Sequence, residues 1–297
     1  MARRKKNADE TLRVCIVGTE MTPFAKSGGL GDVVGSLPLA LKRLGVDVRV
    51  VLPRYKRMER ETNPEKTYVD SFSVSLGWRH QPATVHLMDA GAPCYLIEND
   101  YYFGRDGLYG YGDDFERFAF FSKAVVEMLN YIEFRPHVIH SNDWQTGLVN
   151  LYMRDKYSGF LFFQDIRTLF TIHNLKYQGT FGRGVLGAID LDDGYFAADK
   201  LEFYGNISFM KAGLLYADAV STVSRTYADE IQTMEYGYGM DGLLQTRAGV
   251  LHGIPNGIDY ASNDPATDSH LYFPFDADHM DGKKKNKAAL QDRKSVV

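Results

Sequence analysis

The sequence has few of the features that mark metal-binding, disulfide-bonded or membrane-spanning proteins. Its 297 residues contain only two cysteines, Cys15 and Cys94, and no spacing of cysteine and histidine that suits a metal site. Both cysteines fall in apolar runs, so we expect them to be buried, reduced and inert, as in a cytosolic protein. No run of about 18 apolar residues is present, which argues against a membrane-spanning helix.

The sequence also lacks an excess of positive charge. The net charge is −4, which argues against nucleic acid as the main partner, because such proteins present a basic surface. The basic stretch 1–6 has no apolar core like that of a secretory signal, and it is too short and too poor in serine for a transit peptide. We therefore expect residues 1–11 to be a disordered tail and the protein to be cytoplasmic. A plastid location is the alternative if a transit peptide is missing.

Strand and helix patterns alternate along most of the chain. Residues 12–18 indicate a buried strand, 30–44 a helix and 46–52 a second strand, which together form a βαβ unit. In the helix, an apolar side is expected from Leu30, Val33, Val34, Leu37, Leu41 and Leu44. Further strands are expected at 68–78, 84–88, 95–97, 137–141, 169–172, 219–223 and 250–254, the first two antiparallel. The sequence thus predicts an α/β fold with a Rossmann-like, doubly wound, mostly parallel sheet.

Local signals mark several element ends and one change of composition. We expect Asp113 and Asp114 to cap a helix that runs to Ile132, and Ser224 to cap another. From residue 263 onward Asp, Asn, Pro and Lys dominate, so 263–297 is predicted to be a linker or tail, with a short helix near 287–291.

A glycine-rich turn that carries a lysine lies between the first strand and the first helix. Residues 26–33 read KSGGLGDV, and the helix N-terminus that follows offers unpaired N–H groups suited to a phosphate. The lysine precedes the glycines, which does not fit a P-loop. The glycine spacing and the lack of an acid after the next strand do not fit a dinucleotide site. A tight turn with a surface lysine remains the alternative.

Two further polar residues follow strands of the predicted parallel sheet, where ligands of open α/β sheets bind. Asp143 follows the strand at 137–141, and His173 follows the strand at 169–172. Asp143 has the alternative role of capping the helix that starts at Trp144, and His173 that of a hydrogen-bonded structural histidine. Together with Lys26, these residues place polar groups from three separate loops at one edge of the sheet.

Several blocks resemble the bacterial glycogen synthases and plant starch synthases that use ADP-glucose, in the order in which that family has them. The first is KSGGLGDV, which matches the family pattern Lys-x-Gly-Gly-Leu-(Gly/Ala)-Asp-Val. The others are HSNDWQTG at 140–147, TIHNLKYQG at 171–179, FMKAG at 209–213, YGYGMDGL at 236–243 and NGID at 256–259, with GLYG at 107–110 resembling an acceptor-side block. The similarity extends from about Leu12 to Tyr260.

The resemblance implies roles for individual residues. The catalytic residues would be Asp143, which faces the transferred glucose, and His173, which orients it and stabilises charge without acting as a general base. The resemblance implies that ADP-glucose is bound by Lys26, Gly28, Gly29, Asp32 and Asn256. It implies that the acceptor glucan is bound by Tyr109, Trp144, Asn174 and Tyr177; core packing is the alternative role for Trp144. It implies no metal and no cofactor, since ADP-glucose is a substrate.

The family implied by these blocks consists of retaining hexosyltransferases that extend α-1,4-glucans from ADP-glucose. Their GT-B fold has two Rossmann-like domains that face each other across a cleft. Residues 12–262 match the N-terminal, acceptor-side domain, and the second, nucleotide-binding domain is absent from the sequence. We therefore expect a truncated chain that is inactive alone. The alternative is a non-catalytic glucan-binding module, or a subunit that needs a C-terminal domain on another chain.

Overall fold

The computed structural model describes residues 11–260 and 263–294, so the predicted tail at 1–11 lies almost wholly outside the described residues. The chain divides into two compact units, one that ends at Asn256 and one that begins at Gly257. Each unit is described separately. No helix in the described part is long and apolar enough to cross a membrane.

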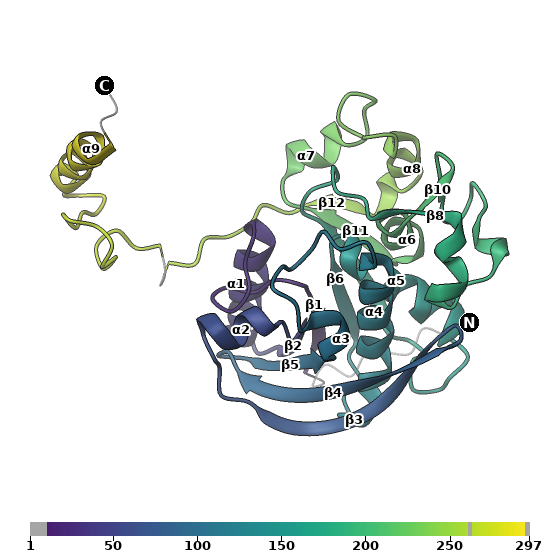
Figure 1. Cartoon of the computed structure of the whole chain (residues 1–297). Helices are drawn as coiled ribbons and strands as arrows, with labels where there is room; N and C mark the ends of the chain where they lie inside the picture. The colour runs from purple at the N-terminus through teal and green to yellow at the C-terminus, as the bar shows by residue number, and fades with distance from the viewer. Residues whose placement is uncertain (1–10, 261–262, 295–297) are drawn as a thin grey trace. The chain divides into compact units, whose positions relative to one another are not determined.

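The first unit is built on a nine-stranded sheet in the described residues, with the order β12-β11-β7-β6-β1-β2-β5-β4-β3 (Figure 1). Only β4 runs against its neighbours β3 and β5, and all other pairs are parallel, which confirms the predicted mostly parallel α/β sheet. The strands are β1 Arg13–Val17, β2 Asp47–Pro53, β3 Thr67–Leu76, β4 Arg79–Asp89, β5 Pro93–Glu98, β6 Val138–Asn142, β7 Arg167–Ile172, β11 Ala219–Thr222 and β12 Leu251–Gly253.

Helices lie against this sheet, and Figure 1 shows α4, α5 and α6 side by side, in agreement with their contacts. The α-helices of the first unit are α1 Gly29–Arg43, α2 Lys56–Glu61, α3 Asp100–Phe103, α4 Asp114–Tyr131, α5 Gly147–Leu151, α6 Phe209–Tyr216, α7 Arg225–Glu230 and α8 Asp241–Thr246. The 3-10 and π-helical turns are η1 Trp144–Thr146, η2 Tyr152–Lys156, η3 Arg183–Ile189, η4 Asp193–Tyr195 and η5 Ala248–Val250. A small antiparallel sheet, which the sequence did not predict, joins β8 Thr180–Gly182, β10 Asn206–Ser208 and β9 Glu202–Phe203.

Helix α1 follows most of the expected pattern. Val34 is fully buried, but Leu44 is 79% exposed, because the helix has already ended at Arg43. The left-handed conformation of Gly45, with φ of 80°, ends the helix at the residue type that tolerates it. Pro38 is buried inside α1 and does not end it.

The prediction that Asp113 and Asp114 cap α4 is wrong, whereas the predicted cap of α7 by Ser224 is confirmed. Neither Asp113 nor Asp114 caps α4: Asp113 forms a paired contact with Arg105, and Asp114 accepts from the backbone of Gly110. Asp113 therefore braces the loop before the helix, and Asp114 braces that loop while it also pairs with Arg117 in the first turn. Ser224 does cap α7, since its hydroxyl accepts from the N–H of Tyr227 at 2.9 Å.

The order of the strands creates a switch point between β1 and β6. From β1 the chain adds β2 and β5 on one side, and it then returns to add β6, β7, β11 and β12 on the other. Ligands of open α/β sheets bind at the carboxyl ends of the strands beside such a point. Cys15 in β1 and Cys94 in β5 are buried and free, as expected, and burial raises the pKa of the Cys15 thiol to about 12.

The second unit contains the helix α9 Asp281–Lys294, which is longer than the predicted stretch 287–291. Its Asn286 side chain pairs with the backbone of Phe273 at 3.2 Å and 2.6 Å. The N–H of Phe275 donates to the carbonyl of Pro265. The described part of this segment therefore has local contacts in addition to the helix.

Candidate functional site

Asp143 and His173 meet directly at the carboxyl edge of the sheet. The carboxylate oxygen Oδ1 of Asp143 accepts from the backbone N–H of His173 at 2.8 Å and from that of Asn174 at 3.4 Å. Asp143 has an unusual backbone, with φ of 58°, and its side chain does not cap the helix that follows. The capping alternative is therefore wrong, and the carboxylate instead joins the loops after β6 and β7.

Burial keeps much of the Asp143 carboxyl population protonated near neutral pH. Burial raises the pKa of Asp143 to about 7, the two backbone N–H donors oppose this, and the nearby Glu20 charge adds to it. A carboxyl group with a pKa near neutrality is typical of sites that act on a substrate, although structural networks produce such shifts as well.

His173 is a neutral side chain with a fixed orientation. Its Nε2 lies 2.9 Å from the Oδ1 of Asn142, whose Nδ2 donates to the carbonyl of Val17 at 3.0 Å. The Asn142 oxygen can only accept, so Nε2 carries the proton and Nδ1 keeps its lone pair. Burial lowers the pKa of His173 to about 4, with a smaller opposing effect of the Glu20 charge. The side chain of Asn142, at the end of β6, therefore fixes the orientation and the tautomer of the His173 ring.

Glu20 is a site residue for which the sequence analysis predicted no role. It is 3% exposed. Its carboxylate accepts from the N–H of Ser27 at 2.5 Å, the hydroxyl of Ser27 at 2.6 Å and the N–H of Gly28 at 3.0 Å. An acid two residues after the predicted buried strand at 12–18, and shortly before the first family block, was the available signal. The carboxylate folds the glycine loop back toward the end of β1.

The hydroxyl of Tyr109 reaches the same carboxylate, so the loop before α4 belongs to the site. It lies 2.9 Å from Oε1 of Glu20 and 2.8 Å from the hydroxyl of Thr19. Burial, followed by the charges of Tyr55 and Glu20, raises the pKa of Tyr109. Tyr109 thus bonds to the carboxylate that also accepts from the N–H groups of the glycine loop.

Lys26 and Asp32, both predicted to bind ADP-glucose, pair with each other at 2.6 Å on an accessible surface. The hydroxyl of Thr22 also donates to Asp32. A Cβ atom built on Gly28 or Gly29 would meet no other atom within 4 Å. The chain's own packing therefore does not require glycine at these positions, and the space before the first turn of α1 is open.

Trp144 packs among aromatic rings, as its alternative role predicted. The ring centroids of Phe118, Phe181 and Phe209 lie 5.2 Å, 5.9 Å and 6.4 Å from that of Trp144. The left-handed Gly179, with φ of 55°, lies so close that a Cβ atom would be 2.2 Å from the indole. The indole is nevertheless only half-buried, so part of it remains accessible.

The remaining candidates are exposed. Asn174 and Tyr177 follow His173 in the same turn, and the side chain of Tyr177 is 61% exposed. Asn256 follows β12, three strands away from β6 in the sheet order. In the part of the chain that the structure describes, no hydrogen bond or ion pair joins Asn256 to the other candidates. The structure thus brings together the loops after β1, β6 and β7, and leaves Asn256 apart.

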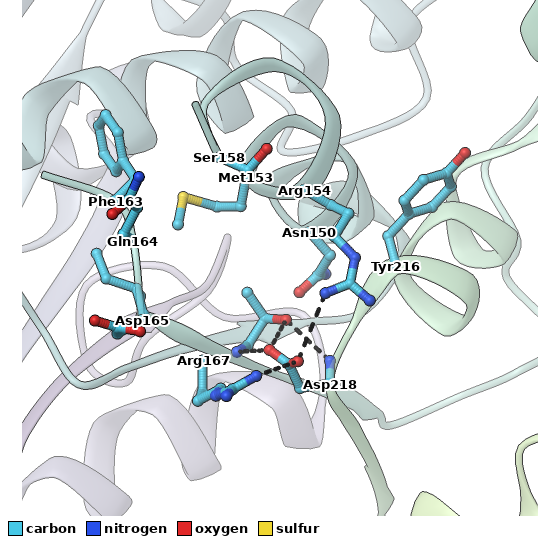
Figure 2. Close-up of a pocket in the computed structure, with 12 residues that line it drawn as sticks. Asn150, Met153, Arg154, Ser158, Phe163, Gln164, Asp165, Arg167, Tyr216 and Asp218 are labelled. Carbon is cyan, nitrogen blue, oxygen red and sulfur yellow. Dashed lines mark hydrogen bonds and ion pairs between the residues drawn. The ribbon is translucent and has the colours of Figure 1, made fainter. Parts of the chain in front are cut away.

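A separate cavity of about 320 Å³ opens at the opposite edge, where β7 and β11 begin (Figure 2). Arg167 and Arg154 converge there on Asp218, with N–O distances of 3.2 Å and 3.8 Å. The Asp218 carboxylate also accepts from the N–H of Thr168 at 2.9 Å. None of the candidate site residues lines this cavity, and its contacts serve to tie the two strands together.

Comparisons with known proteins identify relatives of this chain. The family described as "Starch synthase catalytic domain" matches residues 13–246. The glycogen synthase of Moorella thermoacetica is 49% identical over 95% of this chain and 58% of its own length. That of Clostridium acetobutylicum is 46% identical over 94% of this chain and 59% of its own.

A solved structure is similar as well. It is the catalytic domain of starch synthase IV from Arabidopsis thaliana bound to ADP and acarbose, with a TM-score of 0.88 and 34% identity. The match covers 96% of this chain and 59% of that one. The chain therefore spans less than two thirds of the length of these relatives.

Proposed function

The chain belongs to the starch synthase catalytic domain family, and on that basis we propose that it forms the acceptor-side half of a retaining glucosyltransferase. The reaction moves glucose from ADP-glucose to the 4-hydroxyl at the non-reducing end of an α-1,4-glucan. The bond from the anomeric carbon to the diphosphate breaks, and a glycosidic bond of the same configuration forms. ADP leaves, and the acceptor hydroxyl loses its proton.

The observation that carries this proposal is the contact between Asp143 and His173 beside the glycine loop. Asp143 accepts from the backbone of His173, and Glu20 in the adjacent loop affects the pKa of both side chains. Three loops that are distant in sequence thus meet at the switch point of the sheet. A nucleotide-sugar site in an open α/β sheet needs several loops that converge at this point. Three loops with unrelated roles would have no reason to meet there.

The glycine loop suits the diphosphate of ADP-glucose. Glu20 takes up the N–H groups of Ser27 and Gly28, which leaves those of Gly29 and Leu30 to an anion at the start of α1. When the ligand binds, the Lys26 ammonium leaves Asp32 and contacts the diphosphate, to which it supplies a positive charge. The open space beside Gly28 and Gly29 lets the ligand approach the backbone.

Asp143 and His173 would face the glucose that is transferred. A neutral His173 that keeps a fixed tautomer orients the sugar and provides no proton acceptor of ordinary strength, since its pKa is lowered to about 4. Asp143 interacts with hydroxyl groups of the donor or acceptor sugar. The acceptor glucan extends from this point along the side chains of Tyr109, Trp144, Asn174 and Tyr177. Asn256, which follows β12, contributes a further sugar contact.

Full catalysis needs a facing domain that carries most of the nucleotide site, supplied by the same protein or by another chain. Negative charge develops on the departing diphosphate in the transition state, and fixed donors and cations that stabilise such charge usually contribute most to the rate. We therefore expect the 297-residue chain alone to have negligible transferase activity.

Incorporation of labelled glucose from ADP-glucose into glycogen tests the proposal. The chain is assayed alone and after fusion to the part of the Moorella thermoacetica glycogen synthase that lies beyond the matched span. Transfer by the fusion and none by the chain alone is the expected result. Normal turnover by the chain alone would refute the need for a facing domain. A folded fusion that binds glycogen but transfers no glucose would identify the chain as a glucan-binding module instead.

A further inference from the structure

An exposed tryptophan occupies the tight turn between β3 and β4. Leu76 pairs with Arg79, so only Gly77 and Trp78 form the turn. Only Gly77 has a positive φ, of 52°, and a turn of this kind needs glycine at its first position alone. The second position accepts most residue types, so the turn does not require a tryptophan, and the Trp78 side chain is 76% exposed. Neither the turn nor the core therefore explains a tryptophan here.

The hairpin presents this tryptophan rigidly. A Cβ atom on Gly77 would lie 2.1 Å from the carbonyl oxygen of Gly187, so the tip is packed closely against η3. Behind it, the Lys123 ammonium donates to the carbonyl of Ser75 at 2.6 Å and to Asp190 at 2.7 Å. An exposed ring held in this way loses little conformational entropy when it binds a ligand.

A second exposed ring, Tyr101, is linked to the same place through Arg79. The ring centroid of Tyr101 lies 5.0 Å from that of Tyr102, whose hydroxyl donates to Glu116. The Arg79 guanidinium carbon lies 4.7 Å from the centroid of the Trp78 ring. Nη1 of Arg79 also donates to the buried Glu116 at 2.6 Å, which fixes the guanidinium. Tyr101 is 56% exposed. Trp78, Arg79 and Tyr101 are called the aromatic ledge below.

The aromatic ledge lies at the same edge of the sheet as the candidate site. Strands β3 and β5 both run against β4 and hence run in one direction, so the residues that follow them emerge together at the carboxyl edge. From Tyr101 the chain leads on to Tyr109, and the buried Arg117 fastens this segment by donating to the carbonyls of Tyr102 and Leu108. The ledge is thus continuous with the loop that carries the acceptor-side tyrosine.

The chemistry of the ledge fits a sugar chain better than a protein. Protein hot spots sit in recesses that apolar neighbours seal from water, whereas the rings here flank a charged guanidinium on an open surface. A glucose ring has apolar C–H faces that stack on aromatic rings and an edge of hydroxyl groups that bond to guanidinium and phenol groups. We propose that the aromatic ledge binds the α-glucan acceptor at sugar residues remote from the reacting end. This inference rests on the proposed function.

Intrinsic fluorescence can report on the ledge, because the chain has only two tryptophans. In a Trp144→Phe variant of the full chain, Trp78 is the sole indole, and it is titrated with maltoheptaose and with the β-linked cellohexaose. We expect a saturable change with maltoheptaose alone, and a Tyr101→Ala substitution in this background to weaken binding roughly two- to tenfold. No change with maltoheptaose, or equal responses to both sugars, would overturn the proposal.

Affinity electrophoresis in gels that contain glycogen provides a second test without the Trp144 substitution. Trp78→Ala and Tyr101→Ala should be retarded less than the unchanged chain. Tyr68→Ala, which removes a ring that is 59% exposed at the other end of the same hairpin, should match the unchanged chain. Equal retardation of all four proteins, or none for the unchanged chain, would overturn the ledge. Glucose transfer by the fusion protein would then still support the proposed function, and a lack of transfer would refute that function separately.

Discussion

The amide oxygen of Asn142 lies 2.9 Å from Nε2 of His173, while the amide nitrogen of Asn142 holds the carbonyl of Val17. One buried side chain thus links the last residues of β1 and β6 to the histidine after β7. The amide has no charge with which to stabilise an imidazolium, so burial dominates and His173 stays neutral.

Replacing this amide with a carboxylate should reverse that balance. In Asn142→Asp, a negative oxygen beside Nε2 stabilises the charged ring, so the pKa of His173 should rise above its value of about 4. NMR titration of the imidazole signals measures this, with the exposed His80 as internal reference. An unchanged His173 titration would show that the two side chains are not in contact in solution.

The raised pKa of Asp143 predicts a pH-dependent contribution to stability. An unfolded Asp143 titrates near its ordinary pKa of 3.8 and the folded one near 7, so the folded state holds an extra proton between these values. The stabilisation is complete below about pH 4 and is lost as the pH rises to 7. The difference in unfolding free energy between the chain and Asp143→Asn should fall by up to about 1.4 kcal/mol per pH unit. Denaturation curves from pH 4 to 7 measure it, and parallel pH profiles would contradict the burial of this carboxyl.

Glu20 should be required for the fold of the glycine loop. Glu20→Ala leaves the N–H groups of Ser27 and Gly28 without their acceptor and removes one of the two partners of the Tyr109 hydroxyl. We expect a loss of about 2 kcal/mol or more and faster hydrogen exchange at the two amides. Glu20→Gln, which keeps an accepting oxygen, should lose less. The matched control is Glu61→Ala, which removes an exposed partner of Arg57. Equal losses in Glu20→Ala and Glu61→Ala would argue against this role.

Gly179 should be intolerant of a side chain. In Gly179→Ala the new methyl group meets the indole of Trp144, and the backbone there has a positive φ. We expect a destabilisation of about 1–3 kcal/mol and a shift of the Trp144 fluorescence. Gly182→Ala, where a Cβ atom has free space, serves as the control. If both substitutions have the same small effect, the packing of Trp144 against this turn is not as described.

The sequence was sufficient for the sheet and for the loops of the site. Apolar runs separated by helical periods predicted the strands, and the βαβ order predicted which strand ends share an edge, so Asp143 and His173 could be placed together. The resemblance to known synthases pointed to Tyr109, but only the fold shows that its hydroxyl reaches Glu20.

Other features depend on contacts that no local pattern encodes. The role of Glu20 arises from bonds to residues seven to eighty-nine positions away. Asp113 and Asp114 have ideal capping chemistry, yet other side chains compete for their carboxylates. Arg105 in the preceding loop pairs with Asp113, and Arg117 one turn along α4 pairs with Asp114. The strands of the small sheet are only two or three residues long, too short for a periodic signal.

The central claim is that the loops after β1, β6 and β7 act on one ligand. Glucose transfer by the fusion protein tests it most directly, with Lys26→Ala, Asp143→Asn and His173→Ala compared with Arg167→Ala at the opposite edge of the sheet. The account predicts that each of the first three loses roughly 100-fold or more in rate, while Arg167→Ala keeps its activity. Folded variants of all three residues that transfer glucose at the unchanged rate would contradict it.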